Sequence, residues 1–170
     1  MLTLLIGGAR SGKSDAAVAM ASRWDGSVVF IATAEARDDE MSERIARHKA
    51  ARPAAWTTVE TGDVAGALES VPDGAFVVVD CVTLWLSRLM EREVSDTGID
   101  AVMRDAAQRA AARSAPTVVI TNEVGSGIVP DNPLARRFRD LLGAANRTWA
   151  AASDRALLVV AGRTLELSDE

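Results

Sequence analysis

Apolar and polar positions divide the chain into two kinds of stretch that alternate. Short, nearly continuous apolar runs are typical of strands buried on both faces of a parallel sheet, and they occur at Leu2–Ile6, Val28–Ala32, Phe76–Asp80, Thr117–Thr121 and Ala156–Ala161. Amphipathic or Ala-rich stretches between them predict helices near Asp15–Arg23, Asp38–Ala51, Leu84–Arg92, Ile99–Arg113 and Leu134–Ser153. This alternation predicts an α/β fold, with a mostly parallel sheet covered by helices on both faces.

Two shorter segments complete the expected architecture. A last run at Thr164–Leu167 follows Gly162 and is expected to pair with its neighbour as an antiparallel edge strand. The segment Ser95–Gly98 carries small and polar residues, and we expect it to be the loosest loop.

Composition narrows the class of protein. The chain has 170 residues, 48% of them hydrophobic, and we expect residues 1–170 to form a single domain. The net charge of −5 argues against nucleic acid or an anionic membrane surface as the main partner. No apolar run approaches the roughly 18 residues of a membrane span. One cysteine, Cys81, and an N-terminus without a basic leader predict a cytoplasmic protein without an internal disulfide.

The first predicted strand leads directly into a phosphate-binding loop. The loop consists of Gly7, Gly8, Ala9, Arg10, Ser11, Gly12, Lys13 and Ser14. Its glycines let backbone N–H groups surround phosphate oxygens, Lys13 supplies a charge to the β- and γ-phosphates, and the Ser14 hydroxyl can ligate Mg²⁺. The strand before the loop and the helix after it favour nucleoside triphosphate binding over a turn that matches by chance.

Two carboxylates follow predicted strands, where the active crevice of a parallel sheet lies. Asp80 ends a buried strand, as a second magnesium-organising carboxylate does in phosphate-loop enzymes, although an acid can also simply end a strand. Glu123 lies in a glycine-punctuated loop, Asn122–Pro130, although such a stretch can also be an ordinary turn. Both residues are candidates for the base of a phosphoryl transfer.

The stretch Asp38–Ala50 predicts a helix, because its acidic residues lead and its basic residues follow. Met41, Ile45 and His48 share one face, so His48 is expected on the apolar stripe. It is the only histidine in the chain. A neutral imidazole can attack phosphorus near neutral pH, but spacing alone favours a core or cleft-lining histidine.

The order of several motifs along the chain resembles that of a known family. They are Gly7–Ser14, Ile31–Thr33, Asp39–Met41 with Arg44, Ile45 and His48, Arg52 and Pro53 with Trp56 and Glu60, Asp80–Leu84, Asn122–Pro130, Arg137–Asp140, Gly143 and Asn146. Together they resemble the bifunctional adenosylcobinamide kinase/adenosylcobinamide-phosphate guanylyltransferase family of cobalamin biosynthesis. The resemblance covers nearly the whole chain and implies a RecA-like phosphate-loop (P-loop) NTPase fold.

The resemblance implies two reactions in sequence. The first phosphorylates the aminopropanol hydroxyl of adenosylcobinamide with ATP or GTP, and the second transfers GMP from GTP to that phosphate through a GMP-histidine intermediate. The catalytic residues would be His48 and Lys13. The nucleotide site would comprise Gly7–Ser14, Ile31, Ala32, Thr33, Lys49, Ala50, Ala51, Arg52, Glu60 and Asp80, with Mg²⁺ on Ser14 and Asp80. A homo-oligomer, specifically a trimer, is also implied.

Two residues depart from the family pattern, and two other functions compete with the one that the resemblance implies. Position 80 is Asp where some members carry Glu, and Arg147 stands where the pattern leads us to expect Gln. A kinase without guanylyl transfer would form no adduct on His48, and a GTP-dependent switch would lack transfer chemistry, but no Asn-Lys-x-Asp guanine motif is present. The sequence does not choose between ATP and GTP for phosphorylation, nor does it identify Trp85 or Trp149 as a corrinoid contact.

Overall fold

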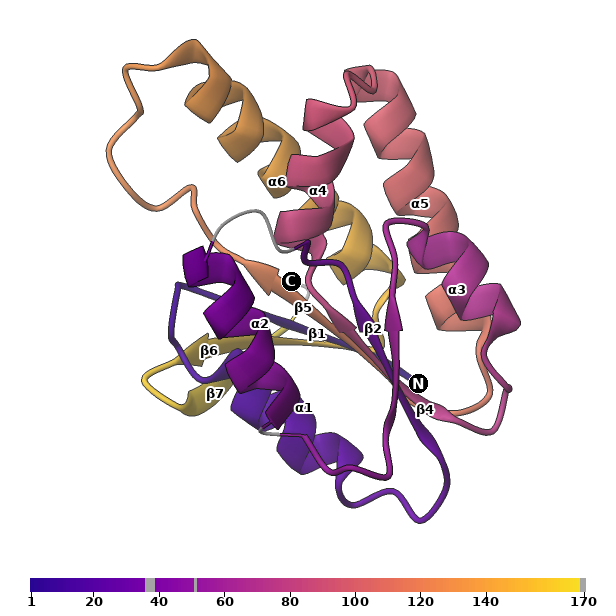
Figure 1. Cartoon of the computed structure of the whole chain (residues 1–170). Helices are drawn as coiled ribbons and strands as arrows, with labels where there is room; N and C mark the ends of the chain where they lie inside the picture. The colour runs from indigo at the N-terminus through magenta and orange to yellow at the C-terminus, as the bar shows by residue number, and fades with distance from the viewer. Residues whose placement is uncertain (36–38, 51, 169–170) are drawn as a thin grey trace.

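The computed structural model describes residues 1–35, 39–50 and 52–168, which form a sheet with helices on both sides (Figure 1). The strands are β1 (Leu2–Gly7), β2 (Val28–Ala32), β3 (Thr57–Glu60), β4 (Phe76–Asp80), β5 (Thr117–Asn122), β6 (Arg155–Val160) and β7 (Arg163–Leu167). The helices are α1 (Lys13–Ala21), α2 (Asp39–Ala50), α3 (Val64–Ser70), α4 (Val82–Glu91), α5 (Asp96–Ala112) and α6 (Pro133–Ala152).

The strands lie in the order β3-β2-β4-β5-β1-β6-β7. All neighbouring pairs are parallel except β6 and β7, which pair antiparallel with Val160 opposite Arg163. The α/β class and the antiparallel edge expected from sequence are therefore confirmed. Because the parallel strands run the same way, the residues after β1, β2, β4 and β5 meet at one edge of the sheet.

The sheet separates two hydrophobic clusters, because successive side chains of a strand point to opposite faces. In β4, Val77 and Val79 join the cluster under α3, α4, α5 and α6, whereas Phe76 and Val78 join the cluster under α1. Figure 1 shows the four helices on one side of the sheet and α1 and α2 on the other. Both faces of the central strands are thus buried, as their continuous apolar runs predict.

The expectation of a loose loop at Ser95–Gly98 is wrong. Ser95 is the N-cap of α5, and its hydroxyl accepts a hydrogen bond from the backbone N–H of Gly98. A serine at this position satisfies one of the N–H groups that have no partner within the first turn of a helix. The small polar residues therefore begin a helix. Asp63 caps α3 in the same way, through the N–H of Gly66.

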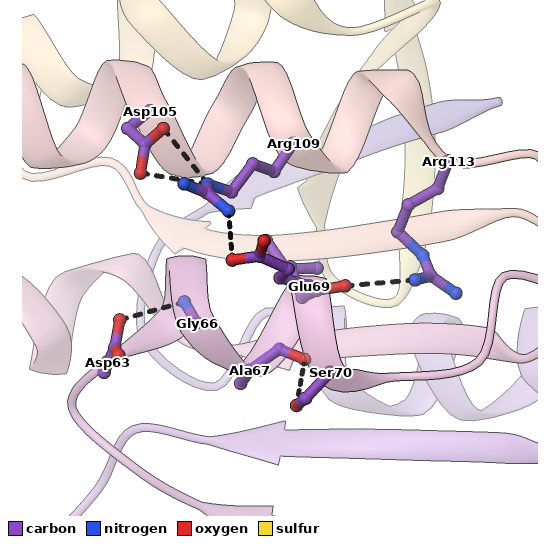
Figure 2. Close-up of polar contacts among 9 residues, drawn as sticks. Asp63, Gly66, Ala67, Glu69, Ser70, Asp105, Arg109 and Arg113 are labelled. Carbon is purple, nitrogen blue, oxygen red and sulfur yellow. Dashed lines mark hydrogen bonds and ion pairs between the residues drawn. The ribbon is translucent and has the colours of Figure 1, made fainter.

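Helix α3 packs against α5 through polar contacts as well as apolar ones (Figure 2). Arg109 of α5 forms ion pairs with Glu69 of α3 at 2.6 Å and with Asp105 one turn earlier at 3.0 Å. Arg113 follows α5 and donates to backbone oxygens at the end of α3. Within the described part of the chain, no helix is long and apolar enough to cross a membrane.

Candidate functional site

The phosphate-binding loop connects β1 to α1 as expected, and its shape depends on a left-handed residue. Gly12 immediately precedes α1 with φ of +99°, a conformation that favours glycine. Lys13 is buried, and its ammonium group donates to the carbonyl oxygens of Gly7 at 2.9 Å and Gly8 at 2.6 Å. Lys13 thus lies over the loop with its charge directed at the loop's backbone, where phosphate oxygens would replace carbonyl oxygens as partners.

The β6–β7 hairpin supports this loop from behind, a contact that the sequence did not reveal. The backbone N–H of Gly162, in the hairpin turn, donates to the carbonyl oxygen of Ser11 at 2.8 Å. A side chain at Gly7 would collide with the carbonyl oxygen of Val159 in β6. Gly7 therefore serves close packing of two strands, in addition to shaping the loop.

Ser14 and Asp80 meet at the sheet edge although they are far apart in the sequence. The Ser14 hydroxyl lies 3.5 Å from Oδ2 of Asp80, and the peptide bond that follows Asp80 is cis. A hydroxyl and a carboxylate are the hard oxygen ligands that Mg²⁺ takes in phosphate-loop enzymes, where phosphate oxygens and water complete the shell. The residues present therefore fit the ion expected from sequence, although no cluster of three or more potential ligand side chains of the His, Cys, Asp or Glu type occurs among the described residues.

The ends of β2 and β4 are joined by a buried hydroxyl. Thr33 donates from Oγ1 to the carbonyl oxygen of Cys81 at 2.7 Å and accepts from the N–H of Cys81 at 2.8 Å. Ile31 is fully buried and Ala32 is half-buried. The backbone of the predicted segment Ile31–Thr33 is also engaged, because the N–H of Thr33 donates to the carbonyl oxygen of Asp80 and the carbonyl oxygen of Ala32 accepts from the N–H of Thr61, each at 3.0 Å.

Two basic residues, Lys49 and Arg52, lie together with Glu60 on the side of Asp80 that is away from the phosphate loop. Lys49, near the end of α2, pairs with Glu60 at the end of β3 at 3.1 Å. The guanidinium carbon of Arg52 lies 3.3 Å from the ring centroid of Phe30. Burial lowers the pKa of Arg52, and the negative charges of Asp80 and Glu60 oppose this shift. The predicted residues Lys49, Arg52, Glu60 and Asp80 therefore belong to one neighbourhood.

The remaining predicted residues of this region are placed less completely. His48 lies in α2, one residue before Lys49, but its side chain is outside the described part of the structure. The same holds for the side chains of Met41 and Ile45, so the expected apolar stripe is untested. Ala50 is exposed at the end of α2, and Ala51 lies outside the described residues.

A buried amide organises the end of β5. Asn146 of α6 accepts at Oδ1 from the Thr121 hydroxyl at 2.6 Å and donates from Nδ2 to the carbonyl oxygen of Asn122 at 3.0 Å. The N–H of Asn122 donates to the hydroxyl of Thr83 at 2.9 Å. These bonds hold the strand end that leads into Glu123. Asn146 appears in the motif order, but only the structure shows what it contacts.

Arg88 lies beside the site but belongs to none of the motifs found in the sequence. Its side chain is 11% exposed, and its guanidinium forms an ion pair with Glu35 and lies 3.5 Å from the carbonyl oxygen of Thr33. A side chain at Gly62 would come within 2.7 Å of its guanidinium carbon. Arg88 therefore joins α4 to the segment after β2 and passes close to Gly62, which follows β3. These segments are far apart in the sequence, so local spacing does not predict the contact.

The two tryptophans considered as corrinoid contacts belong to the core. Trp85 is 1% exposed and donates from its indole nitrogen to the carbonyl oxygen of Gly62, and Trp149 is fully buried. Neither ring is available to a bulky substrate in this structure. The sequence left open whether Trp85, Trp149 or neither residue cradles the macrocycle, and the structure supports neither.

Fold and site together define a P-loop NTPase with a RecA-like, mostly parallel sheet. An ATPase from the type III secretion system of pathogenic bacteria has the same fold, with a TM-score of 0.62 and 12% sequence identity. The match covers 97% of this chain and 56% of that protein, and at this identity it establishes the fold alone.

The chain belongs to the cobinamide kinase / cobinamide phosphate guanyltransferase family, whose model matches residues 3–167. It is 40% identical to the bifunctional adenosylcobalamin biosynthesis protein CobU of Salmonella typhimurium, over 95% of this chain and 97% of that protein. It is 37% identical to the bifunctional adenosylcobalamin biosynthesis protein CobP of Pseudomonas aeruginosa, over 100% and 99% of the two chains. The family resemblance seen in the motifs is thereby confirmed.

Proposed function

We propose that this protein is a bifunctional transferase of cobalamin biosynthesis. It phosphorylates adenosylcobinamide with ATP or GTP and then transfers GMP from GTP to the new phosphate, which gives adenosylcobinamide-GDP and pyrophosphate. Family membership over residues 3–167 supports both activities. One structural observation supports the proposal most directly. Three features border the same edge of the sheet: the phosphate loop, Asp80, and the group of Lys49, Arg52 and Glu60.

Guanylyl transfer is proposed to use His48 as the nucleophile. The imidazole attacks the α-phosphorus of GTP, pyrophosphate leaves, and the cobinamide phosphate oxygen then displaces the histidine. Splitting the transfer in this way makes each displacement easier. Lys13, Lys49 and Arg52 supply positive charge where negative charge develops on the departing pyrophosphate. The position of His48 directly before Lys49 in α2 supports this assignment.

Magnesium is proposed as the cofactor, held by Ser14 and Asp80 together with the nucleotide. When bound, it neutralises phosphate charge. The 3.5 Å separation of the Ser14 hydroxyl and Asp80 Oδ2 supports this pairing. Asp80 would also keep Arg52 close through its charge. The remaining nucleotide contacts are assigned to the loop backbone from Gly7 to Ser14, to Ile31–Thr33, and to Lys49–Arg52 with Glu60.

The direct test of this function is analysis of products. Purified protein is incubated with adenosylcobinamide, Mg²⁺ and either ATP alone or ATP with GTP, and corrinoids are separated by liquid chromatography and identified by mass. The proposal expects cobinamide phosphate in the first reaction and cobinamide-GDP in the second. Phosphorylation without any cobinamide-GDP would restrict the protein to the kinase half, and unchanged cobinamide in both reactions would contradict the proposal.

We also propose a cytoplasmic homo-oligomer, specifically a trimer. Support comes from the β6–β7 hairpin, where Val160, Leu165 and Leu167 are 58%, 63% and 46% exposed. Leu165 and Leu167 pair with Leu158 and Ala156, so they share one face of the sheet.

Sedimentation velocity should give three times the mass of the chain. Leu165→Ser should weaken association, while Thr164→Ser, on the opposite face, should not. A monomer at every concentration would contradict the assembly.

A further inference from the structure

Glu123 occupies a central place in the site that the proposed function leaves without a role. It follows β5, which lies between β1, the strand that leads into the phosphate loop, and β4, the strand that ends in Asp80. The N–H of Glu123 donates to the carbonyl oxygen of Gly7 at 3.1 Å. Glu123 is therefore attached to the first residue of the phosphate loop, on the side that faces the strand of Asp80.

The carboxylate of Glu123 is held by its own loop through one oxygen. Oε1 accepts from the N–H of Gly125 and lies 3.4 Å from the Ser126 hydroxyl. Among the described residues, the hydrogen bonds to this carboxylate all go to Oε1. The strand end beneath it is fixed by the contacts of Asn122 with Thr83 and Asn146. One carboxylate oxygen is thus anchored, and Oε2 is left to accept a proton from a bound molecule.

Asp80 has different surroundings, which separates the two candidate bases. Its Oδ2 lies 3.5 Å from the Ser14 hydroxyl, the other proposed magnesium ligand. Its charge also acts on the half-buried guanidinium of Arg52. A carboxylate that faces a metal ligand and an arginine is suited to bind positive charge. The proton of the acceptor hydroxyl then requires another group, and Glu123 is the carboxylate that directly follows the neighbouring strand, β5.

The loop beyond Glu123 leaves room for a large acceptor. Glu123 itself is half-buried, and every residue from Val124 to Val129 is exposed, including Ile128 at 98%. A small nucleotide does not need so open an approach. A corrinoid that carries its hydroxyl on an aminopropanol arm could present that hydroxyl to the carboxylate while the bulky ring stays outside the sheet edge.

We propose that Glu123 is the general base of the phosphorylation step, an assignment that rests on the proposed kinase activity. The acceptor hydroxyl oxygen forms a bond to the γ-phosphorus of the nucleotide, and the bond to the oxygen bridging the β- and γ-phosphorus atoms breaks with its electron pair. Oε2 of Glu123 takes the hydroxyl proton and later releases it to water. The products are the phosphate ester and a nucleoside diphosphate. A carboxylate has the same task in protein kinases.

The test compares two reactions of the same protein. Glu123→Gln keeps an oxygen that can accept the loop hydrogen bonds but cannot take a proton at neutral pH, Glu123→Asp keeps the carboxylate, and Asp131→Asn removes a charge from an exposed position farther along the loop. Each protein is assayed for phosphorylation of adenosylcobinamide by ATP and for GMP labelling of the protein by GTP alone. Calorimetry measures GTP binding and checks that each variant is folded.

The proposal expects Glu123→Gln to lose at least about 10²-fold in kcat for phosphorylation, the usual contribution of a general base. GTP binding and GMP labelling should stay at the wild-type level, Glu123→Asp should recover part of the kinase activity, and Asp131→Asn should match wild type. Phosphorylation by Glu123→Gln within a few-fold of wild type, or an equal loss of nucleotide binding, would overturn it. Absence of phosphorylation by wild type would instead contradict the proposed function itself.

Discussion

Cys81 shows how burial sets the chemistry of a single residue next to the site. Its thiol is 7% exposed, and burial, reinforced by the negative charge of Asp80, raises its pKa from 9.0 to about 12. The thiolate is the reactive form, so the folded protein should resist alkylation. We predict that iodoacetamide at pH 8 leaves the native protein unmodified by mass spectrometry and adds one group in urea. Rapid modification of the native protein would contradict this burial.

The same shift predicts how stability depends on pH. Between pH 9 and about 12 the unfolded chain releases the thiol proton that the folded chain keeps, so the unfolded state binds fewer protons. The free energy of unfolding should therefore fall in this window through Cys81, and the contribution should be absent at lower pH. Urea denaturation of wild type and Cys81→Ala from pH 8 to 10 isolates the effect. Parallel pH curves for the two proteins would contradict it.

The sequence predicts the site residues that belong to a motif. It does not predict the residues whose position depends on contacts between distant segments. Lys13, Ser14 and Asp80 were identified because strand, loop and helix patterns place them at one sheet edge, and the contact between Ser14 and Asp80 agrees. Arg88 was missed, because its contacts with Glu35 and Thr33 join elements that lie about fifty residues apart. No local spacing carries that information.

Among the elements, α3 depends on an arginine that follows α5. Arg113 is 6% exposed and donates to the carbonyl oxygens of Leu68, Val71, Pro72 and Ala75 at 2.9–3.2 Å. Burial lowers its pKa, and the charge of Asp73 opposes the shift. Arg113→Met should lower the free energy of unfolding by about 3 kcal/mol, because several buried carbonyl groups lose their partner. Urea denaturation measures the change.

Arg109, one turn earlier in the same chain segment, is the matched control. It bonds to Glu69 and Asp105, as Figure 2 shows, and its side chain is 38% exposed. Exposed ion pairs contribute little, so Arg109→Met should change the free energy of unfolding much less than Arg113→Met does. Equal effects of the two substitutions would show that Arg113 does not organise the end of α3.

The sequence predicts the strands that contain continuous apolar runs. It misses short elements that lack such runs and are stabilised by contacts with the rest of the fold. The five parallel strands predicted from buried runs all form, within one or two residues of the predicted bounds. Strand β3 was missed because Thr57–Glu60 is a short, partly exposed edge strand with one apolar residue. Helix α3 is not among the helices predicted from sequence, because it has only seven residues and its start is set by the Asp63 cap.

For the whole molecule, the fold brings together motifs that the sequence could only list in order. The strand order places β5 between β1 and β4, so the phosphate loop, Asp80 and Glu123 share one edge. The β6–β7 hairpin then returns the end of the chain to the phosphate loop through Gly162. The sequence does not predict that this hairpin turn contacts Ser11, because the hydrophobic pattern of an exposed edge strand is too weak to specify where its turn lies.

The central claim is that one nucleotide site passes GMP through His48. The most direct measurement is intact-protein mass spectrometry after incubation with GTP and Mg²⁺ at neutral pH, for wild type, His48→Asn and Glu43→Gln, a control at an exposed position of α2. The account predicts an acid-labile gain of one GMP, with release of pyrophosphate, in wild type and in Glu43→Gln but not in His48→Asn. A folded wild-type protein that binds GTP without forming the adduct, or an adduct that persists in His48→Asn, would contradict it.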